Sequence, residues 1–62
     1  MNQNTIHRTR DFVWEVRSRS GSLLAMITWD EEYENYYVSV GDMDAETFAT
    51  FEEAAEYAEV VL

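Results

Sequence analysis

The chain has 62 residues, a formal net charge of −9 at pH 7 and no cysteine. This length suits one small domain, and 47% hydrophobic residues are too many for a disordered acidic tail. The lack of cysteine excludes disulfides and thiolate metal sites. The negative charge opposes direct binding to nucleic acid or an anionic membrane, and no apolar run approaches the ~18 residues of a membrane helix. We expect a single cytoplasmic domain over 1–62.

The N-terminal half predicts strands separated by turns. Residues 1–10 are polar and are expected to be frayed and flexible. Apolar and polar residues alternate over 12–19, which predicts a strand, and Gly21 in the following turn tolerates a positive φ. Further strands are expected over 23–29 and 36–40, with an acidic loop between them.

Two turns set the register of these three strands. A two-residue turn at Ser20-Gly21 joins the first two strands and gives the pairs Val16 with Ala25, Trp14 with Ile27, and Phe12 with Trp29. A loop that closes the second strand on the third gives the pairs Trp29 with Tyr36, Ile27 with Val38, and Ala25 with Val40. Both registers gather apolar residues on one face, which predicts a three-stranded antiparallel β-meander. A short edge strand at 45–49 would be a fourth.

The C-terminal segment predicts a helix over 50–61. Thr50 and Glu53 have the spacing of a capping box, in which each side chain bonds the backbone of the other residue. Apolar residues then recur at helical spacing, namely Phe51, Ala54, Ala55, Ala58, Val61 and Leu62. We expect this stripe to cover the apolar face of the sheet. The predicted fold class is α+β, a meander packed on one C-terminal helix.

Charge is distributed very unevenly along the chain. Eleven carboxylates and no Lys, Arg or His follow residue 29, whereas the first 29 residues carry four arginines against two acids. Such a surface selects a cationic partner. The candidate partner-binding residues lie in the loop at 30–34, at 42–46 and on the outer helix face, with two interleaved tyrosines: Asp30, Glu31, Glu32, Tyr33, Glu34, Tyr37, Asp42, Asp44, Glu46, Glu52, Glu56 and Glu59. The alternative hypothesis is that the negative charge serves only to keep the protein soluble.

No motif indicates catalysis or a cofactor. His7 lies in the segment expected to fray, and the chain lacks a nucleophile–base arrangement and a Gly-rich phosphate loop. The acids at 42–46 echo a calcium loop, but Thr47 stands where its sharp turn needs glycine. We expect no enzyme activity, no metal and no cofactor.

The second face of the predicted sheet is half apolar. It carries Glu15 and Arg17 beside the residues Val13, Leu24, Met26, Thr28 and Tyr37. Because one helix covers only one face, this patch is predicted to be an exposed, adhesive apolar surface, a homodimer interface or a partner site.

Two resemblances extend this reading. The stretches Tyr36-Tyr-Val-Ser-Val and Thr50-Phe-Glu-Glu-Ala-Ala-Glu-Tyr-Ala resemble the core of the HicB-like antitoxins, over roughly half the chain. That resemblance implies a neutraliser of a small basic toxin. A tiny, lysine-free, acidic α+β chain is also similar in type to phage-encoded inhibitors that imitate DNA, including some anti-CRISPR proteins. This second resemblance, carried by the charge pattern alone, implies carboxylates that stand in for phosphates. The implied target is a basic nucleic-acid-binding protein of an infected bacterium, such as a nuclease or a CRISPR-Cas subunit.

Overall fold

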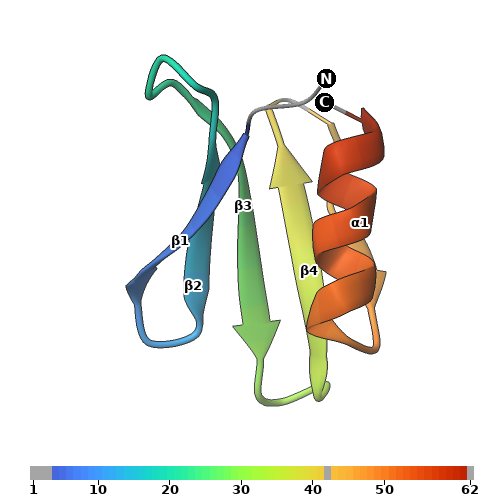
Figure 1. Ribbon diagram of the computed structural model, residues 1–62. Coiled ribbons are helices and arrows are strands. Elements are labelled where there is room, and N and C mark those ends of the chain that lie inside the picture. The colour runs from blue at the N-terminus through green and yellow to red at the C-terminus, as the bar shows by residue number, and fades with distance from the viewer. Residues whose placement is uncertain (1–3, 42, 62) are drawn as a thin grey trace.

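The computed structural model describes residues 4–41 and 43–61, which form a five-stranded antiparallel sheet and one helix (Figure 1). Each strand pairs with its neighbour in the chain, so the sheet order equals the sequence order. The fold class is α+β, and the strand count is five instead of the expected three or four. The elements are β1 (Thr5–Arg10), β2 (Val13–Arg17), β3 (Leu23–Asp30), β4 (Asn35–Val40), β5 (Glu46–Phe48) and α1 (Phe51–Val61).

Strand β1 corrects the expectation that residues 1–10 are frayed; residues 1–3 lie outside the described residues. β1 pairs with β2, placing Ile6 opposite Val16 and Arg8 opposite Trp14. Ile6 packs against the buried core. Most β1 side chains are polar and exposed, so backbone pairing and this one apolar contact hold a strand that shows little hydrophobic alternation.

The β2–β3 hairpin keeps the predicted register but has a longer loop. Val16 lies opposite Ala25 and Trp14 opposite Ile27, as predicted. β2 ends at Arg17 instead of residue 19, and a register shift follows Val16. The Ser18 amide donates to the Ser22 carbonyl at 2.9 Å, so the loop spans 18–22 instead of two residues. In this loop the backbone of Gly21 has φ of 93°, as its turn position requires.

The β3–β4 pairing confirms the second predicted register, with Trp29 opposite Tyr36 and Ile27 opposite Val38. The predicted pair of Phe12 and Trp29 lies just outside the ladder. Phe12 precedes β2, but its carbonyl accepts a 2.9 Å hydrogen bond from the Trp29 amide. On the other side of β4, β5 is the short edge strand expected near 45–49.

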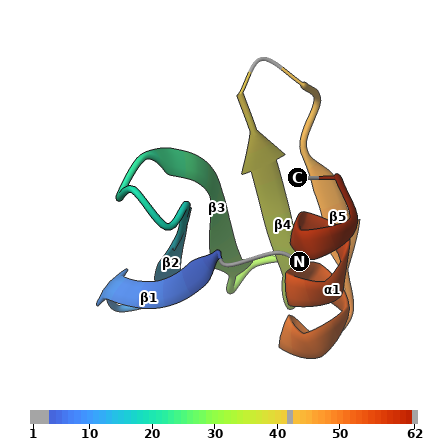
Figure 2. The ribbon, with the colours of Figure 1, turned by 45° about the horizontal axis from the view of Figure 1, so that its top comes forward.

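Helix α1 lies against β3, β4 and β5 on one face of the sheet (Figure 2). Ala54 and Ala58 are fully buried, and these small side chains let the helix approach Ile27 and Val38 closely. A helix is about 10 Å wide, whereas five strands span about 19 Å. The helix therefore leaves part of the β1–β2 side of this face open, which corrects the expectation that its stripe covers the whole apolar face. Within the described chain, no helix has the length and apolarity to cross a membrane.

Candidate partner-binding surface

The fold separates the predicted acidic residues toward two ends of the sheet. The β3–β4 loop lies at the end where α1 begins, and the β4–β5 connection lies at the end where α1 finishes (Figure 1). Glu52 and Glu53 belong to the first helical turn, whereas Glu59 belongs to the last. A six-residue strand such as β4 is about 20 Å long, which exceeds the ~8 Å Debye length at physiological salt. The two ends therefore act as separate negative regions.

Both ion pairs among residues 4–41 and 43–61 lie in the N-terminal part of the chain. Arg8 pairs with Asp11 at 2.9 Å, and Arg17 pairs with Glu15 at 2.8 Å. Arg17 also donates to the Gly21 carbonyl at 2.7 Å, so its guanidinium supports the β2–β3 loop. Arg8 and Arg17 thus serve contacts within their own hairpins, and no described carboxylate after Glu15 has a cationic partner.

Eight of the later carboxylates make no hydrogen bond or ion pair within the described part of the chain. All eight belong to exposed residues. They are Glu31, Glu32, Glu34, Asp44, Glu46, Glu52, Glu56 and Glu59. Asp42, also predicted for this surface, lies outside the described residues. The acidic side chains are therefore available to a partner.

The β3–β4 loop uses one carboxylate to shape itself and presents the others. The Asp30 Oδ1 atom accepts hydrogen bonds from the Glu32 amide at 2.9 Å and the Tyr33 amide at 3.3 Å. Such Asx-type bonding stabilises a tight turn. Tyr33 is 71% exposed, so its ring is available to a partner beside the carboxylates of Glu31 and Glu34.

Helix α1 begins with the predicted capping box. The Glu53 amide donates to Thr50 Oγ1 at 3.1 Å, and the Thr50 amide donates to Glu53 Oε1 at 3.2 Å. The exposed residues Glu52, Glu56 and Glu59 follow on the outer face. Their axial separations are about 6 Å and 4.5 Å. No basic residue lies in the last turn of this helix as described, so the helix presents acids along its length.

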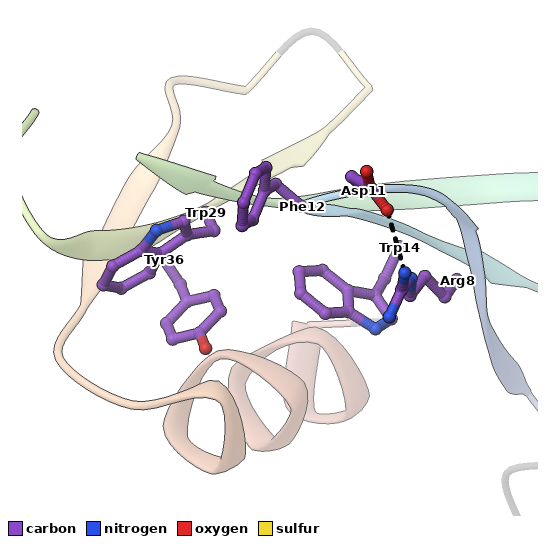
Figure 3. A pocket seen from close by; sticks show the side chains of 6 residues that line it. All are labelled: Arg8, Asp11, Phe12, Trp14, Trp29 and Tyr36. Carbon is purple, nitrogen blue, oxygen red and sulfur yellow. Dashed lines mark hydrogen bonds and ion pairs between the residues drawn. The ribbon is translucent and has the colours of Figure 1, made fainter. Parts of the chain in front are cut away.

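An open aromatic hollow, which the sequence did not predict as a site, lies on the helix-bearing face. Its volume is about 480 Å³, and its lining residues are Arg8, Asp11, Phe12, Trp14, Trp29 and Tyr36. Figure 3 shows the four rings around one space, with the Arg8–Asp11 ion pair at one side. The predicted packing of Tyr36 on Trp29 is confirmed, with ring centroids 4.8 Å apart. Phe51 of the helix packs on Trp14, one of these rings, with the two ring centroids 4.9 Å apart.

Phe12 is the most exposed of the four aromatic residues that line this hollow, and its backbone is unusual. Its residue is 54% exposed, and its φ is 67°, in the left-handed region that bulky residues rarely adopt. The hydrogen bond from the Trp29 amide to the Phe12 carbonyl holds the turn in place. Hairpin loops commonly place glycine in this conformation, so an aromatic residue here retains local strain.

The second sheet face has the composition that the register predicted. One row runs across the sheet through Val13, Thr28 and Tyr37, and the next contains Glu15, Met26 and Ser39. These side chains are half-buried by their neighbours and no helix covers them. Tyr37 therefore lies on the opposite side of the sheet from α1.

No protein-family model, curated protein or solved structure matches this chain.

Proposed function

We propose that the protein is a small inhibitor that binds a cationic nucleic-acid-binding site on another protein in the cytoplasm. Its carboxylates stand in for the phosphates of the displaced nucleic acid. In line with the DNA-mimic inhibitors that the charge pattern resembles, the proposed target is a host defence protein, such as a nuclease or a CRISPR-Cas subunit. The protein acts by occupancy, so the proposal requires no reaction.

The observation that carries this proposal is the set of eight exposed carboxylates without a partner in the described residues. These carboxylates contribute no ion pair to the fold, whereas Asp11 and Glu15 each pair with an arginine. The acids instead lie on the β3–β4 loop, β5, α1 and the segment before β5, while the arginines lie in and near β1 and β2. The exposed carboxylates thus form strongly negative regions at the two ends of the sheet and along the outer face of α1.

The density of this charge resembles that of one nucleic-acid strand. The long axis of the molecule measures 34 Å and the net charge is −9. This corresponds to about one net charge per 4 Å, close to the ~3.4 Å per charge of a single DNA strand and about half the density of the duplex. On the helix, the acids are spaced about 4.5–6 Å apart, comparable with neighbouring phosphates on one strand.

Charge reversal on the outer face of α1 tests the proposal. The double variant Glu52→Lys/Glu56→Lys is compared with Ser20→Lys/Ser22→Lys, which adds two positive charges at exposed positions of the β2–β3 loop, outside the candidate partner-binding residues. If the acidic face of α1 docks on the partner, the helix variant should abolish inhibition while the fold is retained, and the loop variant should still inhibit. A purely solubilising charge predicts that the two variants behave alike and that neither loses a partner.

The salt dependence of capture provides the second measurement. The immobilised protein is exposed to bacterial lysate at about 0.01 M salt, where the Debye length is ~30 Å, and at about 1 M salt, where it is ~3 Å. We expect a nucleic-acid-binding protein to be captured at low salt, and a DNA oligonucleotide to compete with the bound inhibitor. Equal capture at both salt concentrations, or no competition by the oligonucleotide, would contradict the mimic.

The order β4, β5 and then a helix opening in the Thr50 capping box supports a second candidate, a neutraliser of a small basic toxin, through its resemblance to the HicB-like antitoxins. The same experiment separates the two. Capture of a small basic toxin that a DNA oligonucleotide does not displace supports the antitoxin-like function.

A further inference from the structure

We infer that the aromatic hollow formed by Phe12, Trp14, Trp29 and Tyr36 binds the guanidinium group of an arginine side chain on the partner protein. This inference rests on the proposed function, in which the partner presents a basic surface. An arginine of the partner thus anchors the complex, with its guanidinium group in the hollow.

The ring faces supply the attraction. A cation within about 6 Å of an aromatic centroid is attracted by the ring quadrupole, and the planar guanidinium also stacks on the face. Four rings surround the hollow, and Trp14 and Tyr36 lie with their centroids 5.9 Å apart (Figure 3). A volume of about 480 Å³ lies within the range of sites that take small ligands, so one side chain fits.

The adjacent loop supplies the negative field. Trp29 and Tyr36 are paired across β3 and β4, and the loop that joins these strands carries the exposed acids Glu31, Glu32 and Glu34. The first turn of α1, which begins at Phe51, adds Glu52 at the same end of the molecule (Figure 1). A cation drawn to this end of the sheet therefore meets the aromatic walls directly.

The only cation in the lining is already neutralised. Arg8 lines the hollow from β1, and its guanidinium donates to Asp11 at 2.9 Å. Both side chains are well exposed, so Asp11 is available to exchange Arg8 for an incoming guanidinium. A phosphate or nucleobase ligand would gain from Arg8 but would face the overall charge of −9, which favours a cationic occupant.

The backbone at Phe12 gives an independent reason to assign binding to this hollow. A glycine at φ of 67° would form the turn without strain, yet the chain carries an exposed aromatic ring there. Strained backbone that presents a side chain to solvent is characteristic of binding sites. The ring forms one wall of the hollow, and its contribution to binding can be separated from its effect on the turn.

Both tryptophans of the chain line the hollow, so their signals report on it alone. The probes are a blocked Gly-Arg-Gly peptide, the same peptide with neutral citrulline in place of arginine, and thymidine monophosphate, all at constant ionic strength. We expect the arginine peptide to shift both indole N–H resonances, and the citrulline peptide to bind about tenfold more weakly. Equal binding of the arginine and citrulline peptides, or stronger binding of the nucleotide, overturns the inference.

Phe12→Gly separates binding from folding. Removal of the ring should weaken the arginine peptide about threefold to fivefold, while relief of the strained turn raises the urea midpoint of unfolding. Phe12→Tyr keeps a ring and should bind as the parent protein does. Unchanged binding by Phe12→Gly would contradict a role for this wall.

Arg8→Gln tests the sign of the occupant's charge. The variant removes the competing guanidinium and frees Asp11, so we expect the arginine peptide to bind about twofold or more tightly. A weaker arginine complex would show that the hollow does not select cations. If the indole resonances fail to respond while capture of a basic partner keeps its salt dependence, the arginine site is wrong and the proposed function stands.

Discussion

Two non-glycine residues of the described chain, Phe12 and Glu34, have a positive φ, and they lie in neighbouring loops. The β1–β2 turn and the β3–β4 loop are at the same end of the sheet, because the Trp29 amide reaches the Phe12 carbonyl. Left-handed backbone at such residues costs on the order of 1 kcal/mol or more each. The strain is therefore concentrated at the end of the molecule that carries the aromatic hollow and the acidic loop.

For the second of these two residues, we predict that Glu34→Gly raises the free energy of unfolding by about 1 kcal/mol. Glycine adopts the φ of 54° without a steric cost, and the substitution removes one of several like charges in the loop. The measurement is the urea midpoint of unfolding. Glu32→Gly is the control, because it removes a charge from the same loop at a residue without positive φ. Equal stabilisation by both variants would assign the effect to charge alone.

At the scale of the elements, turn chemistry and side-chain alternation were enough to predict the three central strands. The pairs Val16 with Ala25 and Ile27 with Val38 follow from the positions of the turns, and the structure has both. Register was predictable because a shift of one residue would turn the apolar side chains away from the core. The longer 18–22 loop did not alter it, since the register shift after Val16 absorbs the difference.

The sequence pattern predicted neither strand β1 nor the aromatic hollow, and the two omissions are connected because the hollow lies beside the β1–β2 turn. β1 has Ile6 as its one large apolar residue, so its strand character comes from pairing with β2 and not from its own pattern. The shared face of Trp14, Trp29 and Tyr36 was predictable, but a three-stranded sheet would have been largely covered by the helix. With β1 and β5 added, the sheet is wider than one helix. The aromatic rings near the β1–β2 turn therefore remain accessible to solvent. Thr5, Ile6 and Thr9 are the β-favouring residues that could have revealed the strand.

For the helix, we predict that Thr50→Ala destabilises the protein by about 1 kcal/mol. The variant removes the hydroxyl that accepts from the Glu53 amide at 3.1 Å and leaves that amide without its cap. Thr50→Ser retains the hydroxyl and should unfold near the parent midpoint. Urea unfolding followed by far-UV circular dichroism measures the difference. A serine variant as unstable as the alanine variant would exclude the capping hydroxyl as the cause.

We propose that the molecule has two interaction surfaces of opposite character, namely the exposed carboxylates and the half-apolar second face of the sheet. Binding through the exposed carboxylates is screened by salt, whereas the half-apolar second face can associate only by overcoming repulsion between chains of −9 each. We therefore predict that self-association through the second face becomes stronger with added salt, while partner binding becomes weaker.

Sedimentation equilibrium at low and high salt measures this association. Met26 lies between Glu15 and Ser39 in the middle of the second face. Met26→Lys should therefore abolish dimer formation while leaving the eight exposed carboxylates unchanged. A monomer at high concentration under both salt conditions would exclude the homodimer. The charge pattern is visible in the sequence. Whether it selects a partner is tested by comparing the salt dependence of partner binding with that of self-association.

The strand order has a consequence for how quickly the molecule forms. Every strand pairs with the next one in the chain, so each hairpin closes over a short loop and most contacts are local in sequence. Local contacts speed folding, and a chain without proline or cysteine has neither prolyl isomerisation nor disulfide formation to delay it. Each hairpin can form as soon as its second strand leaves the ribosome, and α1, which follows the five strands in the chain, then closes the core. We therefore expect the chain to reach its folded state quickly after synthesis.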